Sequence, residues 1–177
     1  RGLFRPAAER VRRAGAAPGG VGVAGLTVDR TSPPLVPALL DAAGIDDEPR
    51  GALRRALDHK DAAAVAAAGG AASDILCTLV AAAGPAARCF AVLEDVELPR
   101  AAALERDRVG EVLKRLRDAL PELTITLDPV ENRGFEYHSG VSFTIFPSAA
   151  RGALGAGGRY QAEGVGGNQP AAGFTLY

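Results

Sequence analysis

The sequence predicts an α+β protein in which a helical segment packs beside an antiparallel sheet. Apolar residues recur with helical spacing up to about residue 120, and then with the spacing of two that is typical of strands. The strands expected after that point follow one another over short links, which favours antiparallel pairing. We therefore expect a helix and a strand in 1–31, a mainly helical segment in 32–120, and a sheet in 121–177.

The first segment shows a helical pattern over 3–14, which Gly15 and the run Pro18-Gly19-Gly20 end. A strand should follow over 21–28 and stop at the polar run that begins with Asp29. The run 20–25 matches G-x-G-x-x-G, but a dinucleotide site needs a strand before this motif and a helix after it. Here the order is reversed, so we reject that interpretation.

The middle segment contains four short helical patterns, over 32–43, 49–58, 62–68 and 73–83. Ser32 and Asp61 are placed to cap two of these helices, and Gly44 and Gly69 are placed to end two of them. The clearest helix covers 100–120, where Val109, Val112, Leu113, Leu116 and Leu120 share one face. Strands are then expected over 123–127, 141–145, 153–156 and 171–176.

Composition excludes several classes of protein. A formal net charge of −1 provides no general attraction for nucleic acid, and we interpret the arginines of residues 1–13 as a solvated helix face. No stretch is long and apolar enough for a membrane helix, and no signal peptide is recognisable.

Cys77 and Cys89 are predicted to be reduced core residues of a cytoplasmic protein. The absence of methionine indicates a piece of a longer chain whose N-terminal and C-terminal parts are missing.

The chain carries no recognisable catalytic or metal motif. Walker A, H-E-x-x-H and G-x-S-x-G patterns are absent. His59 is expected to be an exposed residue at a helix end, and the acidic residues Glu94, Asp95 and Glu97 are expected to form a solvated loop. We therefore predict no catalytic residue, no metal and no cofactor.

One region departs from simple strand alternation. Between Glu131 and Gly140, and again at Gly157-Gly158-Arg159-Tyr160, an arginine, aromatic rings and paired glycines interrupt an Ala-rich sequence. An arginine can bind a carboxylate through its fork of donors, aromatic rings can contact an imidazole-sized ligand, and glycines let the backbone approach it. The predicted ligand site comprises Arg133, Tyr137, His138, Gly157, Gly158 and Tyr160.

This site makes a geometric demand on the backbone. A regular strand would place Arg133 and Tyr137 on one face and His138 on the other. A shared pocket for Arg133 and His138 therefore requires a bulge or bend, which we expect at Gly134. The alternative is a sheet edge with ordinary aromatic packing.

The run Arg133-Gly134-Phe135-Glu136-Tyr137-His138-Ser139-Gly140, then Gly157-Gly158-Arg159-Tyr160 and Pro170-Ala171-Ala172-Gly173-Phe174, resembles the signature motifs of the histidyl-tRNA synthetases and their non-catalytic relatives. Their typical form is R-G-L-D-Y-Y-T-G, a strand, G-G-R-Y-D and P-A-V-G-F. The resemblance is strongest over 122–177 and implies an antiparallel sheet of the class II synthetase type. It also implies that Arg133 contacts a carboxylate, and that His138 and Tyr160 occupy the positions that line a histidine pocket.

Two departures from the pattern place aminoacylation in doubt. His138 replaces a pocket tyrosine, and Gln161 replaces the acidic residue that normally follows G-G-R-Y. The weaker resemblance over 26–68 favours the regulatory branch, the ATP phosphoribosyltransferase regulatory subunits. Membership of that branch implies a non-catalytic protein that forms a homodimer within a hetero-oligomer. It also implies that the protein assembles with the short catalytic phosphoribosyltransferase and senses histidine, to control the first step of histidine biosynthesis.

Two alternatives remain open at this point. One is a catalytic-core fragment of a histidyl-tRNA synthetase, which would need ATP-binding motifs upstream. The other is a helical interaction module without a ligand, in which the stretch from Arg133 to Tyr160 would form no cavity.

Overall fold

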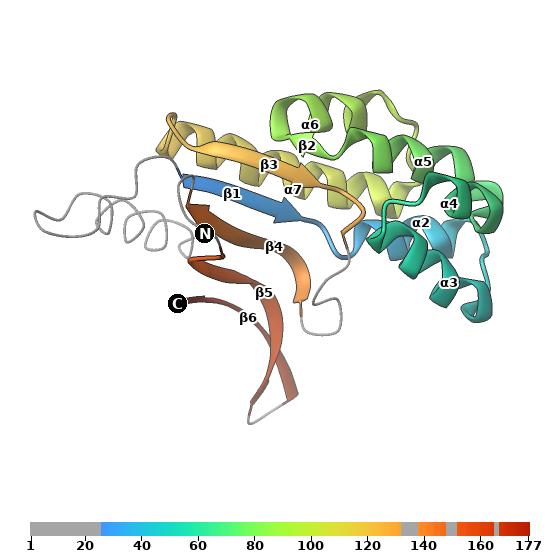
Figure 1. Cartoon of the computed structure of the whole chain (residues 1–177). Coiled ribbons are helices and arrows are strands. Elements are labelled where there is room, and N and C mark those ends of the chain that lie inside the picture. Colours follow the sequence, from blue (N-terminus) through green and yellow to red (C-terminus); the bar gives the residue numbers. More distant parts are fainter. Residues whose placement is uncertain (1–25, 132–137, 148–151, 165–166) are drawn as a thin grey trace, which may run out of the picture.

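The computed structural model describes residues 26–131, 138–147, 152–164 and 167–177 (Figure 1). Within these ranges, six strands form one sheet in the order β2-β3-β1-β4-β5-β6. They are β1 (Leu26–Thr31), β2 (Gly84–Pro85), β3 (Thr124–Asp128), β4 (His138–Pro147), β5 (Gly155–Gly164) and β6 (Gly167–Leu176). Neighbouring strands are antiparallel except for β1 and β3, which run parallel. The expected α+β class is confirmed.

Six α-helices lie between β1 and β3 in the chain. They are α2 (Leu35–Ala42), α3 (Asp47–Asp58), α4 (Ala62–Ala68), α5 (Ser73–Ala82), α6 (Ala86–Asp95) and α7 (Arg100–Ala119). Figure 1 shows α7 running along one face of the sheet behind β1 and β3, while α2 to α5 gather beyond the end of β1. The β5–β6 hairpin extends away from the helices.

Local sequence explains where α3 ends and α4 begins. The amide of Lys60 donates to the carbonyl of Leu57, and the amide of Asp61 donates to the carbonyl of Ala56, which together satisfy the last carbonyls of α3. The carboxylate of Asp61 then accepts a hydrogen bond of 3.0 Å from the amide of Ala64. The expected capping of α4 by Asp61 is therefore confirmed, and α4 has the bounds that the sequence predicts.

The hydrophobic core lies among the helices and against one face of the central strands. Its fully buried members include Leu53, Leu57, Val65, Leu76 and Leu79 from α3, α4 and α5. Val109 and Leu113 of α7 join them, and Ile125 and Leu127 of β3 bring the sheet into the same cluster. Cys89 of α6 is also buried there, and burial raises the pKa of its thiol to about 12, so the thiol stays protonated at neutral pH.

Three expectations need correction. The first strand continues to Thr31 instead of stopping before Asp29, because β1 pairs with β3 and β4 up to that residue. Helix α2 begins at Leu35, with Pro34 as N-cap and no side-chain cap; Ser32 contributes its carbonyl, which accepts from the Leu35 amide.

The third correction concerns the acidic residues after α5. Glu94 and Asp95 lie in the last turn of α6, not in a loop. Both are exposed, as expected. The sequence did not predict α6, whose helical positions follow directly on Gly84 and Pro85.

The expected helix over 3–14, the G-x-G-x-x-G run and the bend at Gly134 lie outside the described residues. Arg133 and Tyr137 also lie outside them.

Candidate functional site

The three central strands have faces of opposite character. On β1, β3 and β4, the residues Val28, Ile125 and Ile145 stand opposite one another in register and are buried. One residue further along each strand, side chains reach the other face. That second face carries Asp29, Thr31, Thr126, Asp128, Ser142 and Thr144, and we call it the polar face.

Cross-strand hydrogen bonds order the polar face. The hydroxyl of Thr126 donates to the carboxylate of Asp29 over 2.5 Å. The hydroxyls of Thr31 and Ser142, which are register partners on β1 and β4, share a hydrogen bond of 2.5 Å. Because these groups are held by their neighbours, the polar face offers a fixed set of oxygen atoms to a ligand.

Lys60 reaches the polar face from the turn between α3 and α4. Its ammonium lies 2.6 Å from one carboxylate oxygen of Asp128 and 2.8 Å from the other. The side chain of Asp128 is 16% exposed and that of Lys60 is 35% exposed, so the ion pair is partly shielded from water. This pair connects the helices to the end of β3.

A cavity of about 680 Å³ lies over the polar face. Polar-face residues, the turn at Lys60 and the hairpin of β4 and β5 all contribute to its walls. The lining residues are Asp29, Thr31, Asp58, Lys60, Asp128, Glu131, Ser142, Phe143, Thr144, Phe146, Ala153, Ala156 and Gly157. We call it the sheet-face cavity. Its volume lies within the range of pockets that hold small molecules.

The structure brings together some of the predicted site residues. His138 and Tyr160 are register partners on β4 and β5, and the register shifts between His138 and Ser142. The Tyr160 ring lies over Gly173 of β6, since a Cβ there would be 3.5 Å from ring and hydroxyl atoms. By strand alternation Tyr160 shares the polar face with Ala156, but it is not among the residues that line the cavity.

Gly157 lines the cavity and also has a packing role. A Cβ at this position would lie 2.5 Å from the carbonyl oxygen of Gly173 and 2.9 Å from the ring of Phe143. The β5 backbone can therefore pass between these neighbours only as glycine. Gly158, the next residue, is buried and pairs with Ser142 and Gly173.

Sequence reasoning missed several lining residues, above all Lys60 and Asp128. The signal was present in the alternation of β3 and β4, whose polar positions all face the same side once the strands are paired. It also missed Arg30, which is 1% exposed on the apolar side of β1. Burial lowers the pKa of Arg30 to about 10, so its guanidinium is still charged at neutral pH.

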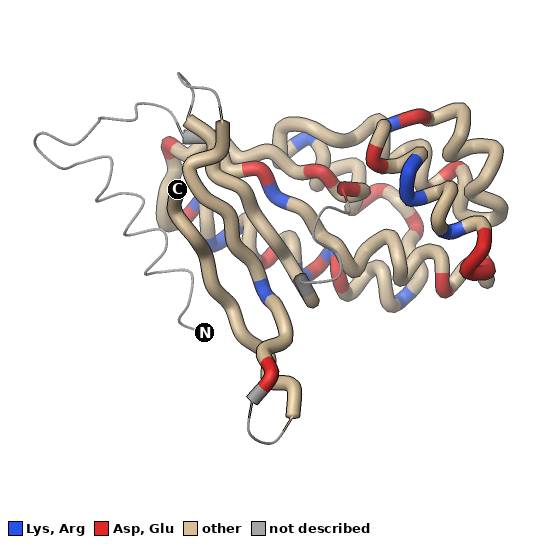
Figure 2. The backbone as a smooth tube through the Cα atoms, turned by 60° about the horizontal axis from the view of Figure 1, so that its bottom comes forward, with Lys and Arg blue, Asp and Glu red and all other residues tan. Residues whose placement is uncertain are grey.

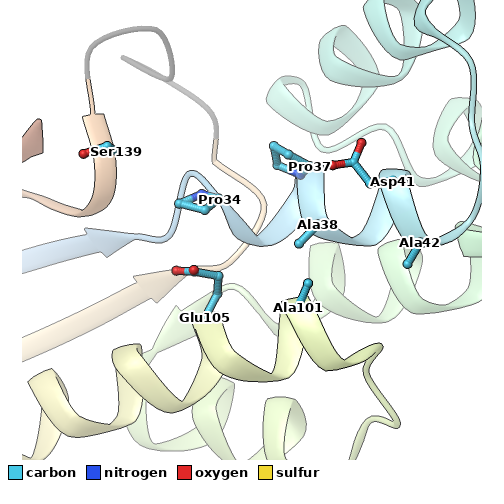
Figure 3. Close-up of a pocket in the computed structure, with 8 residues that line it drawn as sticks. All are labelled: Pro34, Pro37, Ala38, Asp41, Ala42, Ala101, Glu105 and Ser139. Carbon is cyan, nitrogen blue, oxygen red and sulfur yellow. The ribbon is translucent and has the colours of Figure 1, made fainter. Parts of the chain in front are cut away.

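A second cavity, of about 660 Å³, lies between α2 and the first turns of α7 (Figure 3). Its walls are mainly proline and alanine, with Glu105 and Asp41 as the charged residues. Glu105 pairs with Arg108 and Asp41 pairs with Arg50. Within the described ranges, Ser139 is the only residue of the motif regions that lines this cavity. The sheet-face cavity is lined by the predicted residue Gly157 and by several residues of β4, so it is the better candidate site.

The described part of the chain contains no group of three or more His, Cys, Asp or Glu residues placed to hold a metal ion. None of its helices combines the length and the apolar composition needed to cross a membrane.

Curated relatives share the sequence of this chain closely. A protein of Paramagnetospirillum magneticum is 55% identical over 157 residues, which are 89% of this chain and 41% of the relative. A protein of Rhodospirillum centenum is 49% identical over 170 residues, which are 96% of this chain and 44% of the relative. Both are named ATP phosphoribosyltransferase regulatory subunit. The chain therefore spans less than half the length of these relatives.

Solved structures share its fold. A protein of Bacillus halodurans, described as an ATP phosphoribosyltransferase regulatory subunit/histidyl-tRNA synthetase, aligns with 99% of this chain and 48% of its own at a TM-score of 0.74 and 18% identity. A chain of the ATP phosphoribosyl transferase HisG:HisZ complex from Thermotoga maritima aligns with 99% of this chain and 62% of its own at a TM-score of 0.73 and 18% identity.

The family itself follows from a third comparison, made with models of whole families. The model described as histidyl-tRNA synthetase matches residues 7–177, which is nearly all of the sequence. The match covers the helices, the polar face and all strands of the sheet described above. The chain therefore belongs to the histidyl-tRNA synthetase family.

Proposed function

We propose that this chain is part of a regulatory subunit of ATP phosphoribosyltransferase, which supports the first step of histidine biosynthesis without catalysing it. The observation that carries this proposal is the 55% and 49% identity to curated relatives with that name. Identity at this level over 89% and 96% of the chain leaves little room for a different architecture in the aligned part.

The proposed ligand is free histidine, bound at the sheet-face cavity and the adjoining ends of β4 and β5. Fixed carboxylate and hydroxyl oxygens on the polar face suit the ammonium and ring nitrogens of an amino acid. His138 and Tyr160, which pair across β4 and β5, are proposed to contact its side chain, with Arg133 for its carboxylate. Gly157 and Gly158 leave the β5 backbone without side chains beside this ligand.

The proposed partner is the short-form catalytic phosphoribosyltransferase, with the regulatory chain as a homodimer inside a cytoplasmic hetero-oligomer. One structural neighbour, from Thermotoga maritima, comes from a HisG:HisZ complex, and this supports an assembly of that kind. Histidine occupancy would bias the assembly between active and inhibited states in proportion to its differential affinity for them.

Two experiments on the full-length protein test this function. The first is calorimetric titration with histidine, in which we expect saturable binding that weakens in Arg133→Ala and Tyr160→Phe. Absence of binding at millimolar histidine would refute the ligand. The second is reconstitution with the short catalytic chain, in which we expect the regulatory subunit to raise phosphoribosyl transfer and histidine to suppress it.

The second candidate function is a histidyl-tRNA synthetase, because the matching family model carries that description. The replacements at His138 and Gln161 favour sensing over aminoacylation. Histidine-dependent exchange between ATP and pyrophosphate by the full-length protein decides between the two. We expect none, and robust exchange would establish the synthetase.

A further inference from the structure

Lys60 occupies a backbone position at which glycine is usual. Among the described residues it is the one non-glycine residue with a positive φ, at 55°. It follows His59, the C-cap of α3, and its amide donates to Leu57 while that of Asp61 donates to Ala56. This is the hydrogen-bond pattern of a helix end whose left-handed residue is most often glycine. A lysine here gains nothing from the backbone, so its side chain is the feature to explain.

The side chain of Lys60 ends on a carboxylate that organises another part of the chain. Asp128 receives the ammonium on both oxygens, at 2.6 and 2.8 Å. One of those oxygens also accepts from the backbone amides of Val130, at 3.1 Å, and Glu131, at 3.0 Å. Asp128 thus fixes the turn by which the chain leaves β3, and Lys60 fixes Asp128.

The same residues form part of a ligand cavity. Lys60, Asp128 and Glu131 all line the sheet-face cavity, together with Thr31 and Ser142 on the floor. The other charged residues that line it are Asp29 and Asp58. Asp29 accepts a hydrogen bond from Thr126. In the part of the chain that the structure describes, Lys60 is the one basic residue that lines the cavity, so its charge balances part of the negative charge of the lining carboxylates.

We propose that Lys60 is a positioning residue: its ion pair with Asp128 couples the α3–α4 unit to the shape of the sheet-face cavity, so that ligand binding there and the placement of those helices influence each other. The inference rests on the proposed function only for the identity of the ligand. Its physical basis is linkage, because a contact that strengthens in the liganded state must also make the ligand bind more tightly.

Lys60→Gly tests this role without endangering the fold. Glycine adopts the left-handed conformation without steric cost, so the helix end remains satisfied while the ammonium is lost. Lys60→Arg restores a cation that can reach Asp128. The matched control is Arg115→Ala, which breaks an exposed ion pair with Glu111 on α7, and neither of these residues lines the cavity.

The first measurement is amide hydrogen exchange in the ligand-free, full-length protein. We expect Lys60→Gly to speed the exchange of the Val130 and Glu131 amides several-fold, Lys60→Arg to slow it again, and Arg115→Ala to leave it unchanged. Thermal stability of Lys60→Gly should equal or exceed that of the wild type, which separates the effect from unfolding. Unchanged exchange at Val130 and Glu131 would overturn the inference.

The second measurement is the affinity for histidine, by calorimetry. We expect Lys60→Gly to weaken binding by about tenfold, within the usual range of coupling between sites, and Lys60→Arg to recover most of it. Equal affinities of Lys60→Gly and wild type would overturn the coupling. If the wild type binds no histidine at all, the proposed ligand is wrong, and the exchange experiment still decides whether Lys60 positions the turn after β3.

Discussion

The helices and the outer strands of this protein are stabilised in different ways. In α3 to α5, large side chains are withdrawn completely from water: Leu53, Leu57, Val65, Leu76 and Leu79 are all 0% exposed. In β5 and β6, the buried positions are Gly155, Gly157 and Gly158, and no residue of β6 is fully buried. The helical unit is held by side-chain packing, whereas the outer strands are held mainly by backbone pairing.

The charges follow the same division. Figure 2 shows acidic and basic residues spread over the helices, while the described parts of β4 to β6 contain only Arg159 and Glu163. The small residues Ala156 and Gly158, which pair with Thr144 and Ser142 on the polar-face side of β5, leave room there for a ligand. The comparison teaches that side-chain packing is concentrated in the helices and the proposed ligand site lies on the sheet, and the ion pair of Lys60 with Asp128 of β3 joins the two.

The largest expected effect is in the helical core. Leu57→Ala should lower the free energy of unfolding by about 3 kcal/mol, because it removes a fully buried side chain and leaves a cavity. Leu176→Ala, on β6, should cost less than about 1 kcal/mol, since that side chain is 48% exposed. Urea denaturation followed by circular dichroism measures both. A similar loss in the free energy of unfolding for the two variants would contradict the proposed difference between the helical core and the outer strands.

The second prediction compares two Gly→Ala substitutions that should change the free energy of unfolding in opposite directions. Gly157→Ala should lower the free energy of unfolding by about 2 kcal/mol, because its Cβ would lie 2.5 Å from the Gly173 oxygen and from the Cβ of Phe174. Gly51→Ala, inside α3, should raise it by about 0.5 kcal/mol, since only an Arg55 side-chain atom lies within 4.0 Å. Thermal denaturation of the two variants provides the readout, and stabilisation by Gly157→Ala would show that the β5–β6 pairing is looser than described.

A third prediction concerns helix caps. Asp61→Ala should cost about 1 kcal/mol, because the Asp61 carboxylate accepts from the Ala64 amide. Asp46→Ala is the matched control: Asp46 is the N-cap of α3 but makes no side-chain cap hydrogen bond, so its loss should cost less. Chemical denaturation compares them, and an equal cost would mean that charge at the helix start matters more than the hydrogen bond.

The smallest effect is expected at the surface. Arg115→Ala breaks the ion pair with Glu111, whose side chains are 55% and 56% exposed, and should change the free energy of unfolding by less than about 0.5 kcal/mol. Denaturation at low and high salt checks this value. A change above 1 kcal/mol would require a partner for Arg115 beyond Glu111.

Much of the helical region could be predicted from sequence because its signals are local. The cap at Asp61, the end of α4 at Gly69 and the apolar face of α7 each depend on residues that are close together in the chain. Helix α6 was not predicted; it begins directly after Gly84 and Pro85, residue types that are more typical of turns than of a helix start.

The candidate site was less predictable because its geometry depends on pairing between distant segments. Strand alternation showed that Thr126 and Ser142 are polar positions, but only the pairing of β1 with β3 places Asp29 beside Thr126, and only its pairing with β4 places Thr31 beside Ser142. The contact between Lys60 and Asp128 joins residues that are 68 positions apart. No local pattern encodes such a contact, whereas His138 and Tyr160 were predicted from a family motif.

The central claim is that the two halves meet at one histidine site. Hydrogen exchange of the full-length protein with and without saturating histidine tests it most directly. The account predicts that histidine slows exchange in 138–147 and 155–164 and also in 56–64, around Lys60, but not in α6 at 86–95. Protection confined to other segments, or equal exchange in both states, would contradict it.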